Sequence, residues 1–236
     1  MKLAQILFSQ GFGTRRACEG LVVGGYVAID GVVQEKPDRE LATTGLVLNV
    51  EGRDWPFHAS ALLALHKPAG FECSKKPRHH PSVYSLLPAP LLRRDVQAIG
   101  RLDEDTTGLL LFTDDGQLLH RWTSPKHHVP KVYDVSCKHP LDEQQLAELR
   151  EGVVLNDDPM PVRALAAERW LGAAAGLHGL RLTLAEGKYH QVKRMLAAVG
   201  NRVEALHRSR FGQFELPSDL APGAWCWLDG PALVTG

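Results

Sequence analysis

The first part of the chain carries two short helical patterns followed by short extended ones. Apolar residues at positions 3, 6 and 7 recur at helical spacing, and Thr14 suits the N-cap of a second helix that stops at a pair of glycines. Asp30-Gly31 favours a tight turn between two short strands, and Leu46–Leu48 adds a further strand. These patterns predict a small domain over residues 1–52, followed by a linker within residues 51–60.

Strand-like runs dominate the remainder, from residue 60 to residue 236. Ala98-Ile99 and Leu109–Phe112 are short apolar runs typical of strands that are covered on both faces. Lys131–Val135 shows the alternation of a strand with one covered face. Helical patterns are expected near residues 81–87, 116–122, 142–151 and 188–199. Because strands and helices do not alternate regularly, we predict a mixed α/β (α+β) domain with a largely antiparallel sheet.

A hydrophilic loop lies between the first two of these apolar runs. It begins at Arg101 and carries three carboxylates, Asp103, Glu104 and Asp105. A polar loop held by buried strands can position and partly desolvate a carboxylate, and an acidic surface turn is the alternative. In an extended segment Glu104 points opposite to its neighbours, while Asp105 suits a turn or cap group. Arg101 and Asp103 would share a face, either as a structural ion pair or as parts of a site.

The predicted helix at residues 188–199 has two distinct faces. One face carries an apolar stripe at helical spacing, formed by Val192, Met195, Leu196 and Val199. A neighbouring face carries His190, Lys193 and Arg194. The helix would therefore bury one side and offer cations to RNA or to an active site, and a solvated helix face is the alternative.

The charge of the chain is balanced overall but uneven along its length. There are 27 basic and 27 acidic residues, which by itself argues against a nucleic-acid partner. Residues 181–212, however, contain seven Lys or Arg and two acidic residues, whereas residues 131–180 contain five bases and eight acids. A local basic stripe can neutralise RNA phosphates even in a balanced molecule.

Composition favours an ordinary cytoplasmic protein. The hydrophobic share is 44% and the charged share 23%, and no apolar run approaches the roughly 18 residues that span a bilayer, so no membrane partner is expected. The four cysteines are scattered without a C-x-x-C pair, which indicates reduced thiols. The pairs His79-His80 and His127-His128 lack the i, i+4 spacing of a helical metal site, so no metal is expected.

Several motifs resemble those of RNA pseudouridine synthases, in the branch that modifies ribosomal RNA. They are GRLDEDTTGLLLFTDDG from Gly100, EGKYHQVKRML from Glu186 and HKPAG from His66. Residues 123–128 and 206–210 match as well and are expected near RNA phosphates, whereas the HKPAG segment is expected to be structural. The helices and hairpin of residues 1–52 resemble an S4 RNA-binding domain. The resemblance implies a small S4-like domain followed by a pseudouridine synthase domain over residues 60–236.

The resemblance also implies roles for single residues. Asp103 corresponds to the catalytic aspartate of the family, and Tyr133 to the tyrosine that stacks on the target uracil, although a strand tyrosine is ordinarily core. Arg101 corresponds to the arginine associated with the gap left by the extruded nucleotide. Lys193 or Arg194 would pair with the aspartate and keep it ionised, and both remain open. Contacts with RNA are expected from four further basic residues, Arg15, Arg16, His190 and Arg208.

The implied activity is conversion of one uridine of small-subunit rRNA, at position 516, into pseudouridine. This isomerisation transfers no electrons, so neither an organic cofactor nor a metal is needed. The implied partner is small-subunit rRNA, free or in an assembling ribosomal particle, and the protein is expected to be a monomer. The alternatives are a synthase for large-subunit rRNA, a non-catalytic ribosome-assembly factor and, from the carboxylate cluster, a glycoside hydrolase.

Overall fold

The computed structural model describes residues 1–156 and 158–235, which form two compact units. The first unit contains Met1–Ala61 and Leu87–Gln97, and the second contains Leu62–Leu86 and Ala98–Gly236. The predicted division places residues 87–97 in the second domain, whereas their contacts group them with the first. Arg94, for example, donates a hydrogen bond of 2.9 Å to the Gln10 side chain.

The first unit combines short helices with a small antiparallel sheet. Its helices are α1 (Leu3–Ser9), α2 (Arg15–Val23) and α3 (Ala89–Arg93), and its strands, in the order β2-β1-β3-β4, are β1 (Val27–Ile29), β2 (Val32–Val33), β3 (Val47–Val50) and β4 (Arg53–Pro56). The predicted N-cap is confirmed, since the Thr14 hydroxyl accepts the Ala17 N–H. Asp30-Gly31 turns with positive φ at both residues, as a tight hairpin requires. Residues 53–56, expected in a linker, instead pair with β3.

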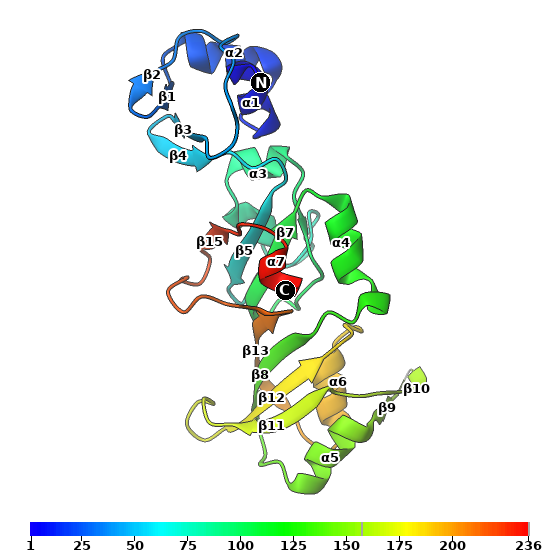
Figure 1. Cartoon of the computed structure of the whole chain (residues 1–236). Helices are drawn as coiled ribbons and strands as arrows, with labels where there is room; N and C mark the ends of the chain where they lie inside the picture. The colour runs from blue at the N-terminus through cyan, green and yellow to red at the C-terminus, as the bar shows by residue number, and fades with distance from the viewer. Residues whose placement is uncertain (157, 236) are drawn as a thin grey trace. The chain divides into compact units, whose positions relative to one another are not determined.

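The second unit is built on one long sheet, in the order β11-β12-β8-β13-β7-β5-β15, with β14 beside β13 and β6 beside β7 (Figure 1). Its strands are β5 (Leu62–Lys67), β6 (Gln97–Ala98), β7 (Thr107–Thr113), β8 (Lys131–Cys137), β11 (Ala166–Trp170), β12 (His178–Leu184), β13 (Val203–Phe211), β14 (Phe214–Glu215) and β15 (Trp225–Trp227). A separate antiparallel pair is formed by β9 (Val153–Leu155) and β10 (Asp158–Val162). The β13–β7 pairing is parallel, and the other pairings along the sheet are antiparallel. The predicted fold class is confirmed.

Helices of the second unit flank this sheet. They are α4 (Gly116–Thr123), α5 (Glu143–Glu151), α6 (Gln191–Ala198) and α7 (Ala232–Thr235), with 3-10 turns at Val83–Leu86 and Pro125–His127. In Figure 1, α5 and α6 lie against β11 and β13, and α4 lies beside β7. The helix predicted near residues 81–87 is only a 3-10 turn. The helix predicted from residue 188 begins at Gln191, because His190 has a φ of 48°, outside the helical region. None of the helices in the described part of the chain has the length and apolar character needed to cross a membrane.

The core of the second unit lies along β5, β7 and β8, whose residues are almost all buried. Strand β8 is thus covered on both faces, rather than on one face as its alternation predicts. Trp122 and Phe211 fill the space beside β7 and are both buried. All four cysteines are free, as expected.

Gly108 allows the parallel strands β7 and β13 to meet. It has a φ of +105°, and a Cβ at this position would lie 2.3 Å from the carbonyl oxygen of Arg208. The two strands pair through only two residue couples, His207 with Thr107 and Arg208 with Gly108. This close approach needs a residue without a side chain, and it fixes the start of β7 directly after the carboxylate loop.

Candidate active site

Asp103 lies in the loop between β6 and β7, and its side chain is 27% exposed. One carboxylate oxygen is 3.4 Å from the Lys193 ammonium, and the other is 3.4 Å from Nε2 of His190. Both partners belong to the start of α6, far away in the sequence. The structure therefore brings the candidate acid and a candidate cation together in a partly desolvated position, where their attraction is stronger than in water.

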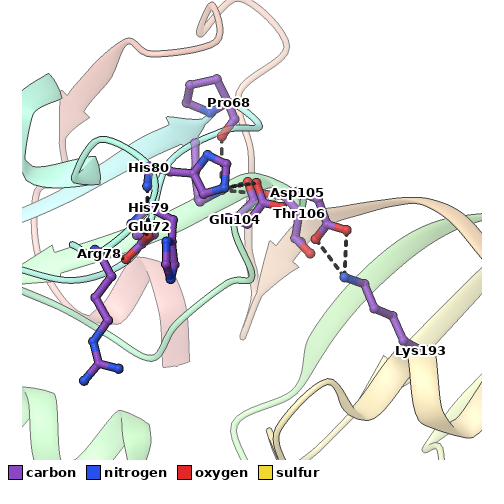
Figure 2. Close-up of polar contacts among 10 residues, drawn as sticks. Pro68, Glu72, Arg78, His79, His80, Glu104, Asp105, Thr106 and Lys193 are labelled. Carbon is purple, nitrogen blue, oxygen red and sulfur yellow. Dashed lines mark hydrogen bonds and ion pairs between the residues drawn. The ribbon is translucent and has the colours of Figure 1, made fainter.

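The Lys193 ammonium is shared between two carboxylates. It lies 2.7 and 2.8 Å from the two oxygens of Asp105 (Figure 2). The nearest oxygen of Asp103 is farther away, at 3.4 Å. Although partial burial works against it, the hydrogen bond to Asp105 and the charge of Asp103 raise the pKa of Lys193. Asp105, expected to serve as a turn or cap group, also forms an ion pair with α6 through its carboxylate. The turn itself is closed by the backbone, from the Thr106 N–H to the Asp103 carbonyl.

Of the two cations left open by the sequence, Lys193 is the one that contacts Asp103. Arg194 is directed along its own segment, where its guanidinium donates a hydrogen bond of 3.0 Å to the Tyr189 carbonyl. Lys193 supplies a compact ammonium that can bridge two carboxylates, whereas a guanidinium would favour a planar, bidentate pair with one.

A small pocket of about 70 Å³ collects the predicted site residues. Its lining includes Arg101, Asp103, Tyr133, His190 and Lys193, which come from the loop, from β8 and from α6. Tyr133 is 8% exposed, so its ring belongs largely to the core and reaches the pocket with one part. Arg101 and Asp103 both line this pocket, and they form no ion pair with each other among residues 1–156 and 158–235. The extended segment thus places both side chains at the same site without pairing them.

A larger cleft of about 730 Å³ opens beside this pocket and shares Arg101, Asp103 and Lys193 with it. One wall is the loop after β5, including Arg78, and the other wall is the segment that enters α6, including Tyr189. Its volume lies in the range of small-molecule and cofactor sites, a few hundred to about 1,000 Å³. The cleft is therefore large enough for a nucleotide.

Lys67 anchors the carboxylate loop from below. Its side chain is fully buried, and its ammonium donates to the carbonyls of Pro68, Glu104 and Thr106 at 3.1, 2.9 and 2.7 Å. Burial lowers the pKa of Lys67, although the nearby carboxylates of the loop oppose this. Lys67 lies in the HKPAG segment, which was expected to be structural, but no role was predicted for this lysine itself. The available signal was a lysine at the end of an otherwise apolar strand.

Arg208 is not presented to RNA phosphates, contrary to expectation. Its side chain is 2% exposed, its Nε donates a hydrogen bond of 2.7 Å to the Leu109 carbonyl, and its guanidinium lies 5.5 Å from the centre of the Phe211 ring. The side chain thus belongs to the interior beside β7. Arg15 and Arg16, in contrast, are exposed at the start of α2 in the first unit.

Other groups around the cleft were not singled out by the sequence. Cys73 lies in its lining, its sulfur accepts the Leu102 N–H at 3.4 Å, and burial raises the pKa of its thiol. Glu72, at the start of the loop after β5, accepts three backbone hydrogen bonds. No group of three His, Cys, Asp or Glu side chains within the described residues is arranged to hold a metal ion.

Comparison with known proteins places this site in a family. The family model for RNA pseudouridylate synthase matches residues 61–198, more than half of the chain. The chain belongs to the RNA pseudouridylate synthase family. The matched range contains the loop of Asp103, strand β8 with Tyr133 and helix α6 with Lys193, so the site described above lies entirely in the synthase domain.

Relatives of the synthase match it over nearly its whole length. The ribosomal small subunit pseudouridine synthase A of Yersinia pestis is 38% identical over 95% of this chain and 93% of its own. The protein of that name from Pasteurella multocida is 35% identical over 100% and 99%, and that from Escherichia coli K12 is 38% identical over 95% of both chains. A solved structure titled "Crystal structure of pseudouridylate synthase" covers 99% of this chain with a TM-score of 0.66 and 32% identity. The protein is therefore an enzyme, a pseudouridine synthase.

Proposed function

We propose that this synthase converts one uridine of small-subunit rRNA into pseudouridine and that Asp103 is its catalytic residue. The observation that carries the proposal is the position of the Asp103 carboxylate, between Lys193 and His190 in a pocket that Tyr133 and Arg101 also line. Three relatives with 35–38% identity over nearly the whole chain are named for the small subunit, which supports this substrate. Within that RNA, the target we propose is uridine 516.

The reaction exchanges one bond for another within the nucleoside. The bond between N1 of uracil and C1′ of the ribose breaks, the base turns, and a bond forms between C5 and C1′. C5 gives up its proton and N1 gains one, so that atoms and electrons balance. A base inside an RNA helix is not accessible to this chemistry, so the target nucleotide is extruded into the site.

The residues of the pocket have distinct roles in this proposal. The Asp103 carboxylate meets the extruded nucleoside, and the Lys193 ammonium lies 3.4 Å from it. The ring of Tyr133 offers a face on which the uracil stacks. Arg101, exposed at the edge of both the pocket and the cleft, lies where the RNA loses its nucleotide.

The first unit is proposed as an S4-like RNA-binding domain. Arg15 and Arg16 stand exposed on the first turn of α2 and offer cations to RNA phosphates. His190 and Arg194, at the start of α6, supply further polar groups on the synthase domain. The substrate is small-subunit rRNA, free or in an assembling particle, and the enzyme acts as a cytoplasmic monomer.

Tritium release from RNA labelled at C5 of uridine tests the role of Asp103, because the C5 proton leaves in the reaction. Asp103→Asn should bind the RNA as wild type does and release no tritium. Glu104→Gln is the matched control: it removes a neighbouring charge of the same loop, is 45% exposed, and should retain release. Release by Asp103→Asn at the wild-type rate would remove Asp103 from the chemistry.

Mapping the modified nucleotide in a deletion strain tests the choice of RNA. Loss of one pseudouridine from small-subunit rRNA is the expected result. Loss from large-subunit rRNA alone would reassign the substrate. If the Asp103→Asn protein fully restores normal growth to the deletion strain, that result would favour a non-catalytic role in ribosome assembly.

A further inference from the structure

The loop after β5 is folded around the carboxylate of Glu72. This carboxylate accepts the backbone N–H groups of Arg78, His79 and His80 at 3.0, 2.8 and 2.9 Å. The backbone of Glu72 closes the other end of the loop, since its N–H donates to the Pro81 carbonyl and its carbonyl accepts the Val83 N–H, both at 2.9 Å. A segment of ten residues that would otherwise be free to vary is therefore held in one shape.

The ionised state of Glu72 is part of this arrangement. Hydrogen bonds from the backbone of His79, His80 and Arg78 lower its pKa from 4.5 to about 2. The carboxylate is thus charged at any pH at which the enzyme is used. It accepts hydrogen bonds from backbone donors. Of the basic side chains in the loop, His80 lies 3.8 Å from the Glu104 carboxylate and Lys75 lies over the Tyr84 ring, whereas the Arg78 guanidinium is directed elsewhere and can meet another anion.

The loop brings basic side chains to the cleft. Between Cys73 and Ser82 it contains no acidic residue and five basic ones, namely Lys75, Lys76, Arg78, His79 and His80. The last three line the same 730 Å³ cleft as Asp103. Figure 2 shows the Arg78 side chain extending away from the Glu72 carboxylate. The Arg78 guanidinium forms no ion pair with any residue in the part of the chain that the structure describes.

We propose that residues 75–80 form an arm that binds the phosphodiester backbone of the RNA beside the target nucleotide, and that Glu72 is the residue that positions this arm. The proposal rests on the proposed function, because the ligand is the RNA substrate of the same site. The planar guanidinium of Arg78 fits a phosphate, the lysines of the arm add point charges, and the histidines add hydrogen-bonding ring nitrogens.

Preorganisation distinguishes this arm from an ordinary solvated basic loop. A flexible loop loses backbone and side-chain entropy when it is ordered on a ligand, whereas a loop whose backbone is already held by Glu72 loses less. The other wall of the cleft brings Lys188, Tyr189 and His190 to the same opening. RNA that places a nucleotide against Asp103 must therefore run between two walls that both offer donors to phosphates.

The salt dependence of RNA binding tests the arm directly. Each phosphate contact contributes about 0.7–0.9 to the slope of log affinity against log salt concentration. Arg78→Ala should lower that slope by about one contact and weaken binding roughly tenfold at low salt, as expected for one charged hydrogen bond. Lys138→Ala, an exposed lysine outside the cleft lining, is the matched control and should leave the slope unchanged.

Glu72→Gln distinguishes a positioning role of Glu72 from a simple effect of its charge, because the two explanations predict opposite changes in RNA affinity. The substitution makes the loop more positive, so a mere charge effect would tighten RNA binding and steepen the slope. If Glu72 positions the arm, the amide loses acceptor strength, the loop loosens, and binding weakens several-fold with a shallower slope. Equal or tighter binding by Glu72→Gln, or an unchanged slope for Arg78→Ala, would overturn the proposal.

Single-turnover tritium release at saturating RNA separates this inference from the proposed function. Arg78→Ala and Glu72→Gln should reach the wild-type rate once RNA is saturating, because the arm acts on binding and Asp103 acts on the chemistry. Failure of the wild-type protein to release tritium would refute the proposed function. Normal wild-type turnover together with unaltered RNA binding by both variants would refute the arm alone.

Discussion

Lys67 is a buried cation whose removal should destabilise the second unit and displace the loop of Asp103. In Lys67→Met the Glu104 carbonyl keeps a second donor, the Gly70 N–H at 2.9 Å, whereas the carbonyls of Pro68 and Thr106 lose a charged donor. Each loss costs about 1–3 kcal/mol in a buried position. Removal of a desolvated ammonium offsets part of this cost, so the expected net loss is about 2–4 kcal/mol of unfolding free energy.

Thermal denaturation followed by circular dichroism measures this loss. For a domain of this size, 1 kcal/mol shifts Tm by roughly 2–4 °C, so Lys67→Met should melt about 5–15 °C below wild type. Lys138→Met replaces an exposed lysine and should stay within about 0.5 kcal/mol of wild type.

The same variant should lose activity below its melting temperature. The Lys67 ammonium binds the carbonyls of Glu104 and Thr106, which follow Asp103 in the same loop. A displacement of the Asp103 carboxylate by about 1 Å can lower the rate 10²-fold. Single-turnover tritium release well below Tm is the assay. A Lys67→Met protein with wild-type release and a Tm within about 2 °C of wild type would refute this reasoning.

Two further predictions concern lysines with shifted pKa values. Asp105→Asn should lower the pKa of Lys193, because partial burial opposes its charge and Asp105 supplies a compensating hydrogen bond. The alkaline limb of the single-turnover pH profile should then move to lower pH, and an unmoved limb would contradict the role of Lys193. Burial, followed by the charge of Arg208, lowers the pKa of Lys131 from 10.5 to about 8. Between these values the unfolded chain holds a proton that the folded protein lacks, so the unfolding free energy rises with pH. Urea titrations at several pH values in this window should show the rise in wild type and not in Lys131→Met, and parallel curves would contradict it.

The sequence predicts much of the site because its main residues lie in local motifs. Asp103 and Arg101 share one extended segment, and Lys193 and His190 recur at one helical spacing, so each group could be placed on a face before the fold was known. The resemblance to pseudouridine synthases then predicted that a cation of the helix pairs with Asp103. The structure adds the distances, 3.4 Å from Asp103 to each of its two partners on α6.

The omissions and errors arise where a residue finds its partner far away in the sequence. Asp105 has a plausible local role at a turn, but its partner Lys193 is 88 residues distant. Arg208 shares the inward face of β13 with Leu206, and its partner, the Leu109 carbonyl, is 99 residues distant. Residues 53–56 look like part of a linker because they end in a proline, which is rare inside strands. They form a strand through their pairing with β3, which the local sequence does not reveal.

The parallel contact between β7 and β13 has a consequence for how the site responds to its substrate. Asp103 precedes β7 and Lys193 precedes β13, so the acid and its cation are attached to opposite sides of a seam with a backbone ladder of two residue couples. Side-chain hydrogen bonds from Arg208 to the Leu109 carbonyl and between Thr107 and His207 add to this junction. A twist of β7 against β13 would therefore change the distance between Asp103 and Lys193.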